Sequence, residues 1–345
     1  MKIAWLSERV RAFGALALAA SLVTGTPALA EEKANTGEAA TAAATKPQWP
    51  ELPYGLTSFA AAVIGDDLYV YGGHKGDAHS YSYDEQNGAL LHLNLKDGKW
   101  EEIATGPRLQ GLAMVAHGGK LYRVGGFSAL NREGEERNLV SQDSVACFDP
   151  KTKTWKDLPA LPEPRSSHDA AVLGDKLYVV GGWTLQGKKE SQWHDTAYVL
   201  DLTAEQPQWE PLPKPDFRRR ALSVAAHNGK IYAIGGMNEK GKPSTRVDVF
   251  DPKTGEWSEG PSLHGEPIEG FGNSSFAVNG RLYVSTIKGR LQRLSEDGKS
   301  WELVGDLADA RFFHRMLPYQ GQLLMVGGAN MGSGKFTNLD LVPAK

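Results

Sequence analysis

Short runs of β-branched and aromatic residues recur along the chain, and most of them end in a pair of glycines. Five segments share this ending: DDLYVYGG (66–73), GKLYRVGG (119–126), DKLYVVGG (175–182), GKIYAIGG (229–236) and GQLLMVGG (321–328). A sixth segment, GRLYVST (280–286), has Ser285-Thr286 where the glycines would fall. Such runs, bounded by turn signals such as Gly-Asp and Asn-Gly, are typical of short β-strands. The pattern predicts an all-β protein with six repeats.

A second marker keeps step with the glycine pairs. Six tryptophans recur at similar spacing: Trp49, Trp100, Trp155, Trp209, Trp257 and Trp301. A third predicted strand ends in a turn just before two of them, in VACFDPKTKTW (145–155) and VDVFDPKTGEW (247–257). Two series with matched spacing of roughly 50 residues indicate a repeat architecture. The chain resembles kelch-repeat proteins over residues 47–345, and this resemblance implies a six-bladed β-propeller with four-stranded blades.

The two ends of the chain predict how the ring closes. Strands expected near 314–319, 322–327 and 336–342 leave the sixth blade one strand short. Residues 48–53, QWPELP, read like the outer strand WKDLP at 155–159. Pairing the two termini removes the open sheet edges, so we expect an N-terminal strand to complete the C-terminal blade.

The first 46 residues are predicted to lie outside the propeller. Basic residues precede an apolar run over 12–23, and Ala-Leu-Ala at 28–30 supplies a cleavage site, which predicts a signal peptide over 1–30. Residues 31–46 are rich in Ala, Thr, Glu and Lys and are expected to be a flexible leader. The apolar run is too short to span a bilayer. We therefore expect an exported protein, periplasmic or extracellular, without a membrane span.

Composition and charge narrow the partners and the chemistry. The chain has 38 Lys and Arg against 41 Asp and Glu, a net charge of −3, so it carries no electrostatic footprint for nucleic acid. Its single cysteine, Cys147, aligns with Val249 and is expected to be a buried apolar residue. Phosphate-binding loops, dinucleotide fingerprints and nucleophile elbows are not found. We expect a monomer without a cofactor that binds a small molecule, a glycan or a protein.

One face of the predicted propeller carries the long loops. The turns between the first two strands of each blade are minimal, as at Gly65-Asp66 and Asn228-Gly229. The segments that follow the glycine pairs are much longer, and they meet at the opposite end of the blades, which we call the long-loop face. Long loops on a rigid scaffold usually carry binding and catalysis. The ligand site is therefore expected on this face.

Arginine, histidine and tryptophan residues gather on the long-loop face. Arg165, Arg219 and Arg311 lie at one offset from their glycine pair. Glu269 takes the same offset in the fifth repeat. Guanidinium and imidazole groups beside a central channel suit an anionic or polyhydroxylated ligand, although they could instead order the loops between blades. The candidate ligand-binding residues are His74, His79, Arg165, His168, Trp183, Trp193, His194, Arg219, Arg311 and His314.

Two of these candidates are aromatic and lie in the third repeat. Trp183 and Trp193 flank a polar loop and stand outside the tryptophan series of the repeats. Exposed indoles can stack on sugar rings or anchor a partner, and they can equally pack against a neighbouring loop. The expected function is thus a ligand-binding module for a carbohydrate, a cell-envelope component or a protein.

Two enzymatic alternatives remain open. His74 and His79 could hold a metal ion in a hydrolase or lyase, or could belong to a solvated polar loop. The segment GGMNEKGKPSTRVDVFD (235–251) is similar to the exported kelch mutarotases of sialic acid, the N-acetylneuraminate epimerases. This resemblance implies catalytic roles for Glu239 and Arg246.

Overall fold

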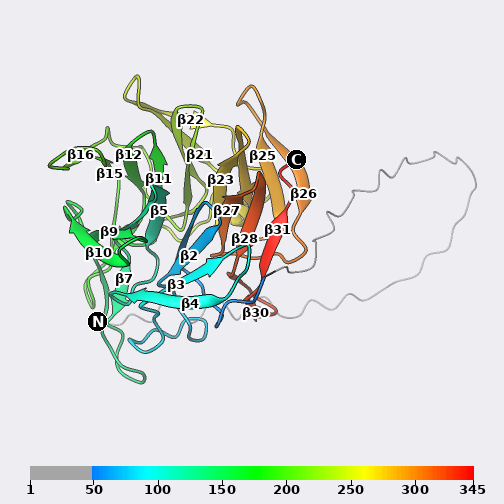
Figure 1. Cartoon of the computed structure of the whole chain (residues 1–345). Coiled ribbons are helices and arrows are strands. Elements are labelled where there is room, and N and C mark those ends of the chain that lie inside the picture. The colour runs from blue at the N-terminus through cyan, green and yellow to red at the C-terminus, as the bar shows by residue number, and fades with distance from the viewer. Residues whose placement is uncertain (1–48) are drawn as a thin grey trace, which may run out of the picture. The chain divides into compact units, whose positions relative to one another are not determined.

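A computed structural model describes residues 49–345 as consecutive antiparallel sheets, which we call blades 1 to 6 (Figure 1). Blades 1 to 5 have four strands each, and blade 6 has three. The helical structure in this range is a single 3-10 turn, η1 (Pro267–Gly270), and none of it has the length or apolar character to cross a bilayer. The all-β prediction is confirmed. The predicted signal peptide (1–30) and leader (31–46) lie outside the described residues.

The strands of each blade follow one another along the chain. Blade 1 contains β1 (Ala60–Ile64), β2 (Asp67–Tyr71), β3 (Ala89–Asn94) and β4 (Trp100–Thr105), and blade 2 contains β5 (Ala113–His117), β6 (Lys120–Val124), β9 (Val145–Asp149) and β10 (Thr154–Leu158). Blade 3 contains β11 (Asp169–Leu173), β12 (Lys176–Val180), β15 (Ala197–Asp201) and β16 (Trp209–Pro211), and blade 4 contains β18 (Ser223–His227), β19 (Lys230–Ile234), β21 (Val247–Asp251) and β22 (Glu256–Gly260). Blade 5 contains β23 (Ser274–Val278), β24 (Arg281–Ser285), β25 (Arg290–Leu294) and β26 (Trp301–Asp306), and blade 6 contains β27 (Arg315–Tyr319), β28 (Gln322–Val326) and β31 (Leu339–Val342).

Short two-stranded ladders extend four of the blades on the long-loop face. They are β7 (Phe127–Ala129) with β8 (Leu139–Ser141), β13 (Trp183–Thr184) with β14 (Gln192–Trp193), β17 (Arg219–Arg220) with β20 (Met237–Asn238), and β29 (Ala329–Asn330) with β30 (Gly334–Lys335). In each ladder one strand begins directly after a glycine pair, where the chain leaves the main sheet.

The first strands of the six blades surround a common axis. β1 contacts β5, β5 contacts β11, β11 contacts β18, β18 contacts β23, β23 contacts β27, and β27 contacts β1. Because the last contact returns to the first blade, the ring is closed, as the six-bladed propeller requires. The prediction of six blades is confirmed.

The hydrophobic core is divided among the gaps between neighbouring blades. Each gap holds one apolar cluster, such as the one between blades 3 and 4 that contains Tyr178 and Phe250. The repeated tryptophans join adjacent blades, because the Trp209 and Trp257 indole N–H groups each donate to a proline carbonyl of the preceding blade at 2.8 Å. Cys147 is buried in one cluster, and burial raises the pKa of its thiol, in agreement with the predicted apolar role.

The glycine pairs allow neighbouring blades to approach closely. Gly182 has a φ of 91°, and its N–H donates to the Arg219 carbonyl of the next blade at 2.7 Å. A Cβ at this position would lie 2.6 Å from the Ser166 carbonyl oxygen, so no larger residue fits without movement. Blade 5 lacks the pair, and there the Thr286 hydroxyl donates to the buried Glu269 carboxylate.

The fourth strand predicted for blade 6 remains a prediction. Residues 49–53 form no strand, and residue 48 lies outside the described part of the chain. The Leu52 N–H donates to the Thr337 carbonyl at 2.7 Å, as Leu161 does to Asp143 just beyond the outer strand of blade 2. Trp49 meets Tyr319 of blade 6 edge to face, with ring centroids 5.8 Å apart. The N-terminal segment therefore packs on the C-terminal blade. Leu52 takes the position in blade 6 that Leu161, just after the outer strand, takes in blade 2.

Candidate ligand-binding site on the long-loop face

A belt of backbone hydrogen bonds surrounds the axis at the long-loop face. It joins one residue from each blade, located just before the first strand: Ser58, Gly111, Ser167, Ala221, Gly272 and Phe313. All six have φ between 51° and 61°. The amide of each residue from Gly111 onward donates to the carbonyl of the residue before it in the belt, at 2.7 to 3.0 Å. This belt holds the main chains of neighbouring blades together at the mouth of the central channel.

The residues next to the belt surround that mouth, and some of them, such as Ser166 and Gln110, are buried whereas others are half-buried. In four blades, the residue before the belt position forms an isolated β-bridge with the residue after the glycine pair. In blade 4 the equivalent two residues pair within the β17–β20 ladder. We call this group of residues, together with Trp193, the axial mouth. The residues before the belt positions are Thr57, Gln110, Ser166, Arg220, Phe271 and Phe312. The residues after the glycine pairs are His74, Phe127, Trp183, Met237 and Ala329. Arg220 is the one guanidinium in the group. Its placement follows from β17, in which neighbouring side chains point to opposite sides.

Arg220 lies against two indole rings from the neighbouring blade. Trp183 and Trp193 face each other across the β13–β14 ladder, with ring centroids 5.3 Å apart. The Arg220 guanidinium carbon lies 4.2 Å from the Trp183 ring and 5.6 Å from the Trp193 ring. One terminal nitrogen of Arg220 is 3.4 Å from the Met237 sulfur, and Nε has no hydrogen-bond partner among the described residues. All four side chains are half-buried, and within the cluster the Arg220 Nε and Trp183 Nε1 atoms are enclosed.

Further aromatic rings continue around the axial mouth. Phe271 and Phe312 approach Phe313 with centroid separations of 5.2 and 5.0 Å, and all three rings are half-buried. On the blade 1 side, Tyr81 packs between His74 and Phe127, at 5.4 and 6.2 Å. The axial mouth therefore contains half-buried aromatic rings from several blades and, in Arg220, one guanidinium.

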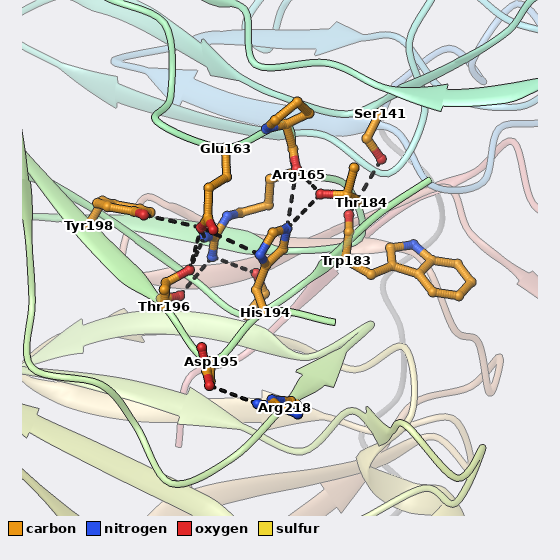
Figure 2. Close-up of polar contacts among 12 residues, drawn as sticks. Ser141, Glu163, Arg165, Trp183, Thr184, His194, Asp195, Thr196, Tyr198 and Arg218 are labelled. Carbon is orange, nitrogen blue, oxygen red and sulfur yellow. Dashed lines mark hydrogen bonds and ion pairs between the residues drawn. The ribbon is translucent and has the colours of Figure 1, made fainter. Parts of the chain in front are cut away.

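The predicted site residues Arg165 and His194 of blade 3 instead belong to a buried polar network (Figure 2). Arg165 is fully buried and donates to the carbonyls of Gly181 and Thr196, at 2.9 and 2.8 Å, and to Glu163 at 3.2 Å. His194 is also buried, with a ring nitrogen 2.9 Å from the Thr184 hydroxyl. Burial, with a contribution from Arg165, lowers the pKa of His194 to about 4, so the ring is neutral near pH 7.

The other two predicted arginines repeat this arrangement. Arg219 and Arg311 are buried, and each donates to the carbonyl of the first glycine in its own pair, at 2.7 and 3.2 Å. Each also pairs with a carboxylate, Asp248 for Arg219 and Asp340 for Arg311. Their terminal nitrogens are thus used within the blade, while the Arg219 Nε atom is buried without a partner in residues 49–345. This geometry supports the structural alternative for Arg165, Arg219 and Arg311 and gives no support to direct contact with a ligand.

The histidines that lie three residues after Arg165 and Arg311 are enclosed as well. His168 and His314 are buried behind the belt, and the His314 Nε2 atom lies 2.6 Å from the Ser285 hydroxyl. Burial lowers the pKa of His314 to about 3, and it lowers that of His168 well below its ordinary value. Neither ring reaches the surface of the axial mouth, so a ligand at the mouth meets other side chains.

His74 and His79, the two predicted metal ligands, differ in their exposure to solvent. His74 is buried against Tyr81, whereas His79 is exposed in the loop with a φ of 66°. Burial lowers the pKa of His74, and its Nε2 atom has no hydrogen-bond partner in residues 49–345. No group of three His, Cys, Asp or Glu side chains suited to a metal ion occurs in this range. The described residues therefore offer no third ligand for this pair.

Glu239 and Arg246, the candidate catalytic pair, line one cavity. It lies beside blade 4 on the long-loop face, outside the axial mouth, and has a volume of about 520 Å³. The Glu239 side chain is exposed. Arg246 donates to Asp248 at 2.6 Å and to Asp216 at 2.7 Å, so its guanidinium is already paired with two carboxylates.

Behind the belt, the central channel is crossed by an ion pair. Arg315 of blade 6 reaches Asp169 of blade 3 at 3.0 Å and also donates to the carbonyls of Phe59 and Leu112, at 3.2 Å each. The second carboxylate oxygen of Asp169 accepts from the Val224 amide at 3.0 Å. A cavity of about 270 Å³, lined mainly by small apolar residues of the first strands, lies along the axis beside this pair.

Comparison with known proteins places the chain in a family. The family described as the KLHDC2/KLHL20/DRC7 Kelch-repeats domain matches residues 36–182 and 160–286. The chain therefore belongs to the kelch-repeat proteins, in agreement with its repeat spacing and six-bladed fold.

Individual relatives show how far the similarity extends. Mouse Kelch-like protein 35 is 28% identical over 62% of this chain, and the chain spans 41% of that protein's length. N-acetylneuraminate epimerase from Haemophilus influenzae (strain PittEE) is 25% identical over 85% of this chain and 91% of its own. The solved structure of YjhT superimposes with a TM-score of 0.69 at 20% identity, covering 86% of this chain and 97% of that one, and this likeness shows the fold alone.

Proposed function

We propose that this kelch propeller is an exported module that binds a carbohydrate at the axial mouth. One observation carries the proposal: half-buried aromatic rings from several blades, with Trp183 and Trp193 foremost, gather around the axis on the face that bears the long loops. The apolar C–H faces of sugar rings pack well on such surfaces. Export is proposed from the N-terminal sequence pattern.

Rigidity of the platform supports this function. The two indoles are held in register by the β13–β14 ladder, and the belt ties blade 3 to blades 2 and 4. A preorganised surface loses little conformational freedom when a ligand binds. The name of the Haemophilus relative, N-acetylneuraminate epimerase, also supports a sugar as the ligand class.

Binding to a glycan panel tests the proposal. The purified propeller is titrated with soluble glycans, and tryptophan fluorescence and ligand-observed NMR report binding. Trp183→Ala and Trp193→Ala are each expected to raise the dissociation constant by about tenfold or more, because each removes part of the stacking surface. Leu303→Ala, at an exposed side chain of outer strand β26, is the matched control and is expected to bind normally. If no glycan binds, or if the tryptophan variants bind as tightly as the control, the proposal fails.

A sugar epimerase is the second candidate function, favoured by the shared cavity of Glu239 and Arg246. In such a reaction Glu239 would move the proton of the ring-opening step as a general acid or base. The pairing of Arg246 with two aspartates makes this the weaker candidate. NMR exchange between the α and β anomers of N-acetylneuraminate tests it: the exchange is expected to accelerate with the protein and to slow again with Glu239→Gln. Exchange at the buffer rate would exclude this activity.

A further inference from the structure

We propose that the axial mouth recognises a carboxylate and that Arg220 is the group that binds it. This inference rests on the proposed function, because it names the chemical class of the carbohydrate: an acidic sugar, such as a uronic acid, instead of a neutral one.

The charge of Arg220 is the first argument. Three buried arginines of the same face each have a carboxylate partner: Arg165 has Glu163, Arg219 has Asp248 and Arg311 has Asp340. Arg220 has no carboxylate within ion-pair distance in residues 49–345, although it is half-buried. A charged group withdrawn from water without a partner is costly unless something else neutralises it. A bound anion would provide that partner.

The orientation of the guanidinium is the second argument. The Arg220 guanidinium carbon lies over the Trp183 ring, 4.2 Å from its centroid, and a guanidinium that contacts an aromatic face can still donate hydrogen bonds from its N–H groups. Nε is buried and has no acceptor in the described part of the chain, as is also true of Nε in Arg165 and Arg219, so only the terminal nitrogens of Arg220 can meet a ligand. One of them contacts the Met237 sulfur, a weak acceptor that a carboxylate oxygen could replace. Burial also lowers the pKa of Arg220, which agrees with a cation that lacks a counter-charge.

The surroundings of Arg220 decide between a sugar acid and a small inorganic anion. Trp183 and Trp193 flank the guanidinium, and Tyr81 of blade 1 is close enough for its phenol to affect the pKa of Arg220. Arg137 in turn lies over the Tyr81 ring at 5.2 Å. A sugar ring placed on the indoles would bring a ring carboxylate against Arg220, whereas a free anion would leave the aromatic rings unused.

A matched pair of ligands tests the inference. Methyl β-D-glucuronide and methyl β-D-glucoside differ at one carboxylate, and NMR titration gives the dissociation constant of each. The glucuronide is expected to bind about 10- to 100-fold more tightly, as one charge-assisted pair predicts. Arg220→Met is expected to abolish this preference, so that the two glycosides bind with equal dissociation constants. Arg281→Met, at the opposite end of the blades and paired only with exposed Glu296, is the control and is expected to keep the preference.

The outcomes separate the two proposals. If Arg220→Met keeps the preference for the glucuronide, or if the native protein binds both glycosides equally, the carboxylate inference is overturned while sugar binding stands. If neither glycoside binds but neutral glycans of the panel do, the inference is likewise overturned. If no glycan binds at all, the proposed function falls together with the inference. Urea unfolding of each variant verifies that a loss of binding does not come from a loss of folded protein.

Discussion

The ion pair across the axis makes a direct prediction about how the ring is held closed. Arg315 belongs to the last blade and Asp169 to the third, so the pair joins opposite sides of the propeller. Arg315 also binds the backbone of blades 1 and 2 through Phe59 and Leu112. Replacing Arg315 with Met removes all of these contacts and retains much of the apolar side-chain volume. The variant should therefore unfold more readily than the native protein.

The magnitude follows from burial and hydrogen bonding. The side chains of Arg315 and Asp169 are 22% and 9% exposed, so both groups are largely removed from water. Breaking a buried pair by removing one partner costs about 3–5 kcal/mol, because the other charge is left uncompensated. The partial exposure of Arg315 and the remaining Val224 amide on Asp169 reduce this penalty. We expect Arg315→Met to lower the free energy of unfolding by about 2–4 kcal/mol.

Urea unfolding followed by tryptophan fluorescence at pH 7 measures this loss. Lys188→Met is the control, because it breaks an ion pair with Glu136 whose side chains are 75% and 73% exposed, and it should cost at most about 1 kcal/mol. The double variant with Asp169→Asn should lose less than the sum of the two single variants, by about 1–3 kcal/mol. If Arg315→Met and Lys188→Met unfold within about 0.5 kcal/mol of each other, the axial pair does not hold the ring.

Three further predictions concern groups that the fold encloses. Burial, then Arg311 and Arg315, lowers the pKa of His314 to about 3; the unfolded chain takes up the proton first, so stability is lost as the pH falls from about 6.5 towards 3. Between pH 7 and 4.5, the free energy of unfolding of His314→Gln should fall by about 2–3 kcal/mol less than that of the native protein. If urea titrations show an equal fall for both proteins, the prediction is contradicted. The Cys147 thiol, buried and with a raised pKa, should react with a chromogenic disulfide reagent only after unfolding, and rapid reaction of the native protein would show that it is accessible. Gly270→Ala should cost about 2–3 kcal/mol, because a Cβ there would lie 1.7 Å from the Ser244 carbonyl oxygen, whereas Gly332→Ala meets nothing closer than 3.7 Å and should be neutral in the same thermal unfolding assay.

Part of the candidate site could be predicted from the sequence. Trp183 was recognisable because it follows a glycine pair on the long-loop face and lies outside the repeated tryptophans, and the structure places it at the axial mouth. Arg220 was missed, although it directly follows the predicted Arg219. The two arginines point to opposite sides of β17, so a difference of one position separates the blade interior from the axial mouth. The offset that Arg219 shares with Arg165 and Arg311 indicated a repeated role, and the buried hydrogen bonds to the glycine pairs show what that role is.

The sequence by itself determined the all-β class, the six repeats and the face that carries the long loops. These features depend on local signals, namely strand-forming runs, turn residues and glycine pairs. Each repeat contains these signals, and their recurrence along the chain gives the number of repeats. Only the tertiary structure decided which polar groups are enclosed within the blades and which lie at the axial mouth. Asp169 and Arg315 lie 146 residues apart, and Arg220 meets indoles 27 and 37 positions before it, so the contacts arise only when the ring brings distant blades together. Burial and unpaired charge are properties of that arrangement, because they depend on every neighbour in space and not on the order of residues along the chain.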